Sequence, residues 1–124
     1  MRLRSARLLA GLLFLCISWP VRADYLYSVD YTEAAQAVLA RRYVDARGLA
    51  DRMLESDPDS FEAHAVLGQV HLRGEEDLGL AQFHLNRARA LLERRFPPPL
   101  GQAGPRALHQ EILRNLRQTA YLRE

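Results

Sequence analysis

The chain has 124 residues, of which 17 are basic, 15 are acidic and one is cysteine. This length is enough for one modest hydrophobic core and too short for two domains. A single cysteine excludes an internal disulfide framework, and the near balance of charge gives no strongly basic surface for nucleic acid.

The first 23 residues have the pattern of a secretory signal peptide. A positive head, an apolar run of eleven residues and a small-residue exit follow one another as Arg2, Arg4 and Arg7, then residues 8–18, then Val21-Arg22-Ala23. A membrane-spanning helix needs about 20 apolar residues, and Trp19-Pro20 ends this run earlier. Cys16 follows larger residues than a lipid-attachment site usually has. We therefore expect cleavage after Ala23 and a periplasmic or secreted protein with no stable membrane span.

Cleavage would change both the charge and the cysteine content. It removes four arginines and no acidic residue, which leaves 13 basic and 15 acidic side chains, a net charge of −2 and no cysteine. A mature chain of this kind is expected to form no disulfide and to bind no nucleic acid. All 17 basic residues are arginine, which is typical of a GC-rich bacterial genome.

Hydrophobic periodicity predicts an all-α chain of five helices, because no stretch alternates apolar and polar residues as a strand would. The first two helices are expected at about 30–41 and 44–56. Their apolar stripes are Tyr31, Ala34, Ala35 and Val38 in the first, and Ala46, Leu49, Ala50, Met53 and Leu54 in the second. Neither helix could bury its stripe alone, so the two are expected to pair as antiparallel neighbours.

The segment Asp57-Pro58-Asp59-Ser60 separates the second helix from a third at about 60–72. Proline suits a first helical turn, and Asp59 with Glu62 three residues later forms an aspartate version of the capping box. A tight turn at 74–77 then leads to a fourth helix at about 77–96. The acidic residues of this turn suit a helix N-terminus, and they lack the alternating oxygen ligands of a calcium loop.

A linker rich in proline and glycine over residues 97–105 precedes a fifth helix at about 106–122. Leu108, Ile112, Leu116 and Ala120 form one face of that helix. The helix either caps the fourth helix with this face or begins a third hairpin that is truncated. The expected organisation is a leader over 1–23, two helical hairpins over 24–96, the linker, and a C-terminal helix within 106–124.

Two stretches of the chain match each other at a mean spacing of 34 residues. Ala34-Ala35 corresponds to Leu67-Gly68 at a separation of 33, and Ala46 corresponds to Ala81 at a separation of 35. The best-matched segment carries Tyr43, Ala46, Leu54, Asp57 and Pro58. Over residues 27–96 the chain therefore resembles the tetratricopeptide repeat (TPR) family, whose hairpins stack into a short solenoid and bind proteins or peptides.

The match departs from the family pattern in several places. The first helix has Ala34 where leucine is usual, and one additional residue precedes Ala81. His64 and His71 stand where the family has two aromatic residues, within the motif His64-x-x-Leu67-Gly68-x-x-His71. These two histidines lie about 10 Å apart along a helix axis, which is too far to bind one metal ion directly. We expect them to fill space between helices, with no metal site.

No other pattern in the sequence predicts catalysis or a cofactor. His84 and His109 have no cysteine or acidic partner at zinc spacing. Ser28, Ser56 and Ser60 lie near helix ends, where serine commonly caps. The sequence has no Gly-x-Ser-x-Gly motif and no phosphate-binding glycine loop. We expect no catalytic residues and no cofactor.

The resemblance implies that the first helix of each hairpin lines a concave groove. In the third helix, the residues off the packing stripe are Glu62, Ala65, Gln69 and Arg73, and we predict that they contact a partner. The chain has no lysine, so the family's best-known carboxylate-binding site is not expected. The sequence thus favours an exported adaptor or scaffold for a protein or peptide. The alternatives are a structural subunit of a larger helical-repeat assembly, including a homo-oligomer, or the truncated N-terminal part of a larger TPR protein.

Overall fold

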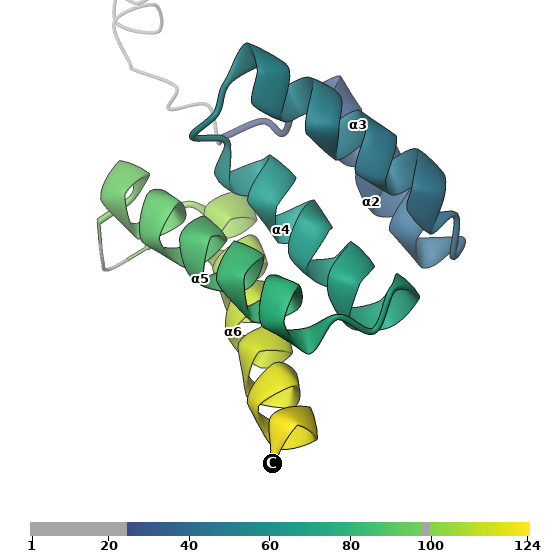
Figure 1. Cartoon of the computed structure of the whole chain (residues 1–124). Helices are drawn as coiled ribbons and strands as arrows, with labels where there is room; N and C mark the ends of the chain where they lie inside the picture. The colour runs from purple at the N-terminus through teal and green to yellow at the C-terminus, as the bar shows by residue number, and fades with distance from the viewer. Residues whose placement is uncertain (1–24, 98–99) are drawn as a thin grey trace, which may run out of the picture.

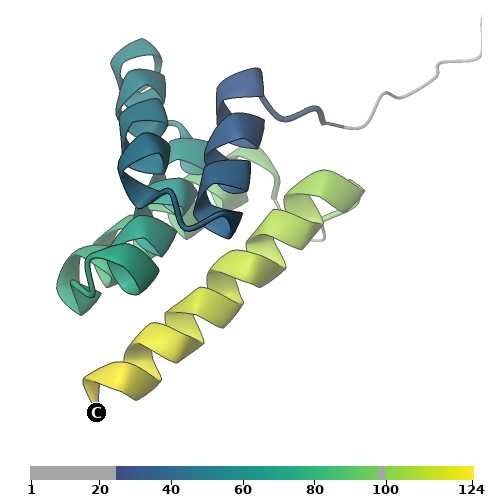
Figure 2. The same cartoon turned by 90° about the vertical axis from the view of Figure 1, so that its right-hand side faces the viewer.

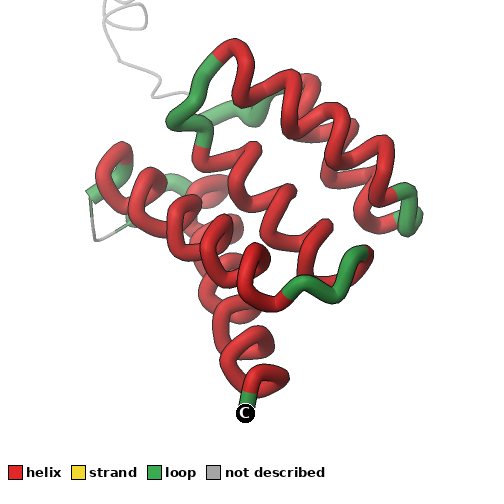
Figure 3. Tube along the Cα trace, viewed as in Figure 1, coloured by secondary structure: helices red, strands yellow, loops and turns green. Residues whose placement is uncertain are grey.

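A computed structural model of the chain describes residues 25–97 and 100–124. Its elements are α2 (Val29–Leu39), α3 (Tyr43–Ser56), α4 (Phe61–Gln69), the π-helical turn η1 (Val70–Gly74), α5 (Leu78–Arg95) and α6 (Ala103–Arg123) (Figure 1). The predicted all-α class is confirmed, and no strand occurs in these two ranges (Figure 3). The predicted leader lies outside them.

Consecutive helices pack as adjacent antiparallel pairs, from α2 with α3 through to α5 with α6 (Figure 1). One hydrophobic cluster joins α2, α3 and α4 around residues such as Val38, Met53 and Val66. A second joins α4, α5 and α6 around Leu92 and Ile112. Because α4 contributes to both clusters, it is the central helix of the fold. None of the helices described is long and apolar enough to cross a membrane.

Side-chain caps fix where three helices begin. Ser28 accepts a hydrogen bond from the backbone of Tyr31 at the start of α2, and Asp77 does the same for Leu80 at the start of α5. The predicted capping box of Asp59 and Glu62 is wrong by one residue. Ser60 is the N-cap of α4, since the Asp59 backbone is held in the preceding turn by the side chain of Asp57.

The additional residue of the second hairpin is accommodated by η1. The helix that begins at Phe61 widens into a π-turn at Val70–Gly74, closed by a hydrogen bond from Glu75 N to Val70 O. A π-turn takes up one more residue than an α-turn. The insertion before Ala81 therefore leaves the α4–α5 contact in place.

Small residues set the distance between α4 and α5. A Cβ atom on Gly68 would lie 2.5 Å from both Cγ and Cδ2 of Leu85, so the leucine side chain occupies the space that glycine leaves. Ala81 and Ala88 of α5 are fully buried. This close approach gives a steric reason for the Leu67-Gly68 step and for the alanines of the second helix.

Helix α6 begins at Ala103, three residues before the predicted start, with Pro105 in its first turn. Proline is tolerated there because the first backbone N–H groups of a helix lack internal partners. The helix runs diagonally across the molecule and lies close to α4 and α5 (Figure 2). Its buried residues are Pro105, Leu108, Ile112, Asn115 and Thr119.

Candidate functional site

Two adjoining hollows of about 170 and 380 Å³ lie between α2 and α6, with α4 as their floor. They share four lining residues, namely Val38, Leu39, Gln69 and Glu111, so they form one continuous depression. We call this depression the α2–α6 groove. It lies on the side of the first helices of both hairpins, and α6 forms its second wall.

One end of the groove is mainly apolar. Tyr31, Ala35 and Val38 of α2 face Val66 of α4 there. Burial raises the pKa of the Tyr31 hydroxyl, and the nearby Glu111 carboxylate raises it further. The tyrosine is therefore a neutral hydrogen-bond donor at physiological pH. This end can accept an apolar side chain and one polar group.

The other end of the groove is basic. Arg41, Arg73 and Arg114 line it, and all three are exposed. Among the described residues, none of the three forms an ion pair. The one acidic lining residue, Glu111, already accepts a hydrogen bond from Gln69 Nε2 at 2.5 Å. The groove thus offers three uncompensated guanidinium groups beside an apolar surface.

The four predicted partner-binding residues are not equally accessible. Gln69 and Arg73 line the groove, and Arg73 also lies 3.5 Å from the side-chain oxygen of Asn115 on α6. Ala65 is buried among α4, α5 and α6, and only 5% of Glu62 is exposed. The expectation of an open surface position is wrong for Glu62 and Ala65, because α6 and the segment before α2 cover them. Partner binding itself stays a prediction.

Glu62 instead holds the N-terminal segment against α4. Its carboxylate accepts hydrogen bonds from the Tyr25 hydroxyl and from the Ser28 hydroxyl, the latter at 3.1 Å. Burial raises the pKa of Tyr25, and the hydrogen bond to Glu62 adds to this rise. A carboxylate that receives two hydroxyl groups is stabilised in its charged form. The role of Glu62 is therefore to fix Tyr25 and the start of α2.

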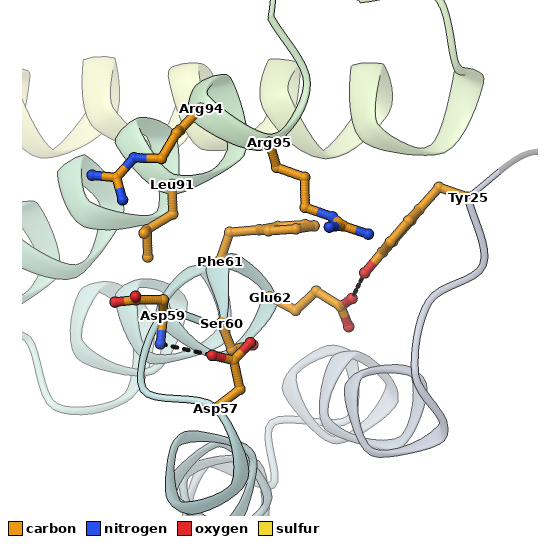
Figure 4. Close-up of a pocket in the computed structure, with 9 residues that line it drawn as sticks. All are labelled: Tyr25, Asp57, Asp59, Ser60, Phe61, Glu62, Leu91, Arg94 and Arg95. Atoms are coloured by element: carbon orange, nitrogen blue, oxygen red, sulfur yellow. Dashed lines mark hydrogen bonds between the residues drawn. The ribbon is translucent and has the colours of Figure 1, made fainter.

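A separate cavity of about 580 Å³ lies at the start of α4 (Figure 4). Phe61 and Leu91 form its apolar part, and Arg94 and Arg95 reach in from the end of α5. Its acidic residues are already engaged. Asp59 pairs with Arg87 at 3.1 Å, Asp57 accepts from the Asp59 backbone, and Glu62 binds Tyr25. The charges are of both signs, and no pair of side chains has the geometry of an acid and a base acting together.

Three histidines lie in a column between α4, η1 and α5. His84 is central, with ring centroids 5.3 Å from His64 and 5.4 Å from His71. The predicted role of His64 and His71 as space-filling residues between helices agrees with their burial. Sequence spacing did not indicate that His84, from another helix, would join them. No group of residues in the described ranges could hold a metal ion.

Sequence reasoning missed Arg41, Tyr43 and Arg114 as groove residues. Arg41 follows α2 with a φ of 60°, a left-handed conformation that is unfavourable for a side-chain-bearing residue by about 1 kcal/mol. Arg114 was assigned to the solvent-facing side of the fifth helix. Only the crossing of α6 over α4 places it beside Arg73, and no local pattern carries that information.

No family model matches this chain, and no curated protein or solved structure matches it either.

Proposed function

We propose that this protein is an exported TPR-like adaptor that binds a peptide segment of a partner protein in the α2–α6 groove. The 34-residue spacing, the two antiparallel hairpins and the close contact of Gly68 with Leu85 support the TPR-like assignment. The groove supports the binding role, since it lies on the α2 and α4 side where hairpin-repeat proteins receive their ligands.

The observation that carries the proposal is the charge distribution along the groove. Arg41, Arg73 and Arg114 are grouped at one end, with an apolar wall that includes Val38 immediately beside them. Guanidinium groups bind carboxylates through paired hydrogen bonds. The favoured ligand is an extended segment in which acidic residues follow apolar ones.

Peptide binding tests the proposal directly. The probe is a fluorescein-labelled peptide with leucines followed by glutamates, and a peptide with lysines in place of the glutamates is the reference. We expect the acidic probe to bind and the basic one not to. Replacing Arg73 by glutamate (Arg73→Glu) should weaken binding at least tenfold, since a lost charge-assisted hydrogen bond costs about 1.5–3 kcal/mol.

The matched control is Arg52→Glu, which makes the same charge change at an exposed position of α3 away from the groove. It should leave the affinity within about twofold, because exposed charges at such separations are screened by salt. Equal loss of binding in both variants would mean that net charge, and not the groove, attracts the probe. Equal binding of both peptides would refute the proposed recognition.

A second candidate function is that of a structural subunit whose surface associates with another copy or with a larger assembly. Phe83 and Tyr121 are 60% and 76% exposed, and Leu122 is half exposed. The hydrogen bond between Gln82 and Arg123 brings these segments of α5 and α6 together. Sedimentation over a range of concentrations separates the two functions. A monomer that binds the acidic probe supports the adaptor, and a dimer that dissociates on Phe83→Ser supports the structural subunit.

A further inference from the structure

The histidine column, which consists of His64, His84 and His71, has a geometry that depends on protonation. His64 Nδ1 lies 3.1 Å from His84 Nδ1, and His64 Nε2 lies 3.4 Å from the Pro58 carbonyl. A neutral His64 that donates from Nε2 must accept at Nδ1, so His84 donates from its own Nδ1. If both rings were charged, two N–H groups would point at each other. The contact therefore requires at least one neutral ring.

The column also continues to the end of the α4–η1 rod. The rings of His84 and His71 are nearly parallel, with an interplanar angle of 8°. His71 is 4% exposed, and its Nδ1 lies 2.8 Å from Glu75 Oε2, although the angle is not that of a hydrogen bond. Charging His84 would place a positive ring between two other histidines at the contact that joins the second hairpin.

We propose that the histidine column is an acid-sensitive latch between α4 and α5, which holds the hairpin closed while its rings are neutral and loosens it when more than one ring is charged. This inference does not depend on the proposed function. It concerns the stability of the second hairpin, whatever that hairpin binds.

The surrounding charges give little compensation for a charged column. Of the carboxylates near it, Asp59 is paired with Arg87 at 3.1 Å, and Glu75 is paired with Arg47 at 2.5 Å. Asp51 of α3 is the remaining acidic group that acts on His84. Both arginines are themselves repulsive, since Arg87 disfavours a charged His64 and Arg47 disfavours a charged His84. The column is thus surrounded by near-neutral pairs.

Burial and the neighbouring histidines lower the pKa of His84 to about 4, and burial lowers the pKa of His64 as well. A group with a lowered pKa in the folded state stabilises the fold above its unfolded pKa, about 6.5 for histidine. That stability is lost as the pH falls from about 6.5 toward 4. For His84 alone the linkage at pH 5 is about 30-fold in the folding equilibrium. Solvent screening of its half-buried ring reduces this to roughly tenfold.

Thermal unfolding of the full mature chain between pH 7.5 and 5.0 tests the latch. The melting temperature of the wild type should fall by roughly 5–10 °C, because a tenfold change corresponds to about 1.4 kcal/mol and a domain of this size shifts about 4–8 °C per kcal/mol. In His84→Gln the central ring cannot be charged, so most of this fall should disappear. The matched control is His109→Gln, since His109 lies outside the column and bonds Glu93 at 3.0 Å. It should retain the wild-type pH dependence.

A direct readout keeps the inference falsifiable if His84→Gln does not fold. The imidazole proton resonances of the wild type can be followed through the same pH range by NMR. We expect the His84 ring to remain neutral at pH 5.5, and the amide protons of α4 and α5 to lose protection before those of α2 and α3. Titration of all three column histidines near pH 6.5, or equal pH dependence in His84→Gln and the wild type, would overturn the latch.

Discussion

Replacing Gly68 by alanine tests the close packing of α4 on α5, which underlies the whole arrangement of the second hairpin. The new Cβ would lie 2.5 Å from two carbon atoms of Leu85, and Leu85 is fully buried, so it has no free space to move into. Overpacking of this kind costs about 1–3 kcal/mol. Alanine returns up to about 1 kcal/mol through its higher helix propensity. We expect a net destabilisation of about 1–2 kcal/mol.

Gly48 provides a matched control within the same protein. It lies in the middle of α3, is exposed, and has no neighbouring atom within 4 Å of the position that a Cβ would take. Gly48→Ala should therefore stabilise the chain by about 0.5–1 kcal/mol through helix propensity alone. The same substitution thus has opposite signs at two helical positions, and the difference between the variants should be about 2–3 kcal/mol.

Urea unfolding followed by far-UV circular dichroism measures both variants. Helical signal is the suitable probe, because the single tryptophan, Trp19, lies in the predicted leader. A double variant, Gly68→Ala with Leu85→Ala, separates the steric clash from other effects. Their coupling energy should be favourable by about 1 kcal/mol or more, in the range typical of residues in contact. The reasoning is refuted if Gly68→Ala is as stable as Gly48→Ala.

Three further outcomes follow from other contacts. Glu62→Ala should lower stability by about 1–3 kcal/mol in urea unfolding, because the buried Tyr25 hydroxyl loses its acceptor; an unchanged midpoint would show that the N-terminal segment does not need this bond. Asp77→Ala should cost about 1 kcal/mol as the α5 cap to Leu80 is lost, whereas Asp77→Ser should cost little. Asn115→Leu should raise the melting temperature, because the side-chain nitrogen of Asn115 is buried with no hydrogen-bond partner among the described residues; a fall would indicate that its contact with α5 is sterically full. Intact mass of the exported protein should correspond to a chain that begins at Asp24, and a mass that includes the leader would contradict cleavage.

The helices themselves could be predicted from local sequence. Their apolar stripes follow a 3.6-residue period, and their boundaries coincide with Ser28, the Asp57-Pro58 step and Asp77 within about three residues. The pairing of neighbours also followed, because short connections force consecutive helices to run antiparallel. The cap of α4 was misplaced by one residue, since Asp59 and Ser60 are both good capping residues and local sequence does not choose between them.

The candidate site could be predicted only in part. Gln69 and Arg73 were expected on the groove side of α4 from their position relative to the packing stripe, and they lie there. Glu62 and Ala65 have the same periodicity, yet they are buried. Helical phase alone states which way a residue points. It does not state whether another segment covers that direction.

The sequence by itself determined the helical class, the amphipathic faces and the spacing of small residues that lets α4 approach α5, because each depends on residues close together in the chain. The tertiary structure alone decided how α6 crosses the other helices. Its buried positions, among them Leu108, Ile112 and Asn115, follow alternating steps of three and four, so Ala120 of the predicted stripe is exposed. That crossing closes one wall of the groove, and the meeting of α5 with α4 assembles the histidine column. Both depend on contacts between residues distant in sequence, whose geometry is set by packing energy over the whole core.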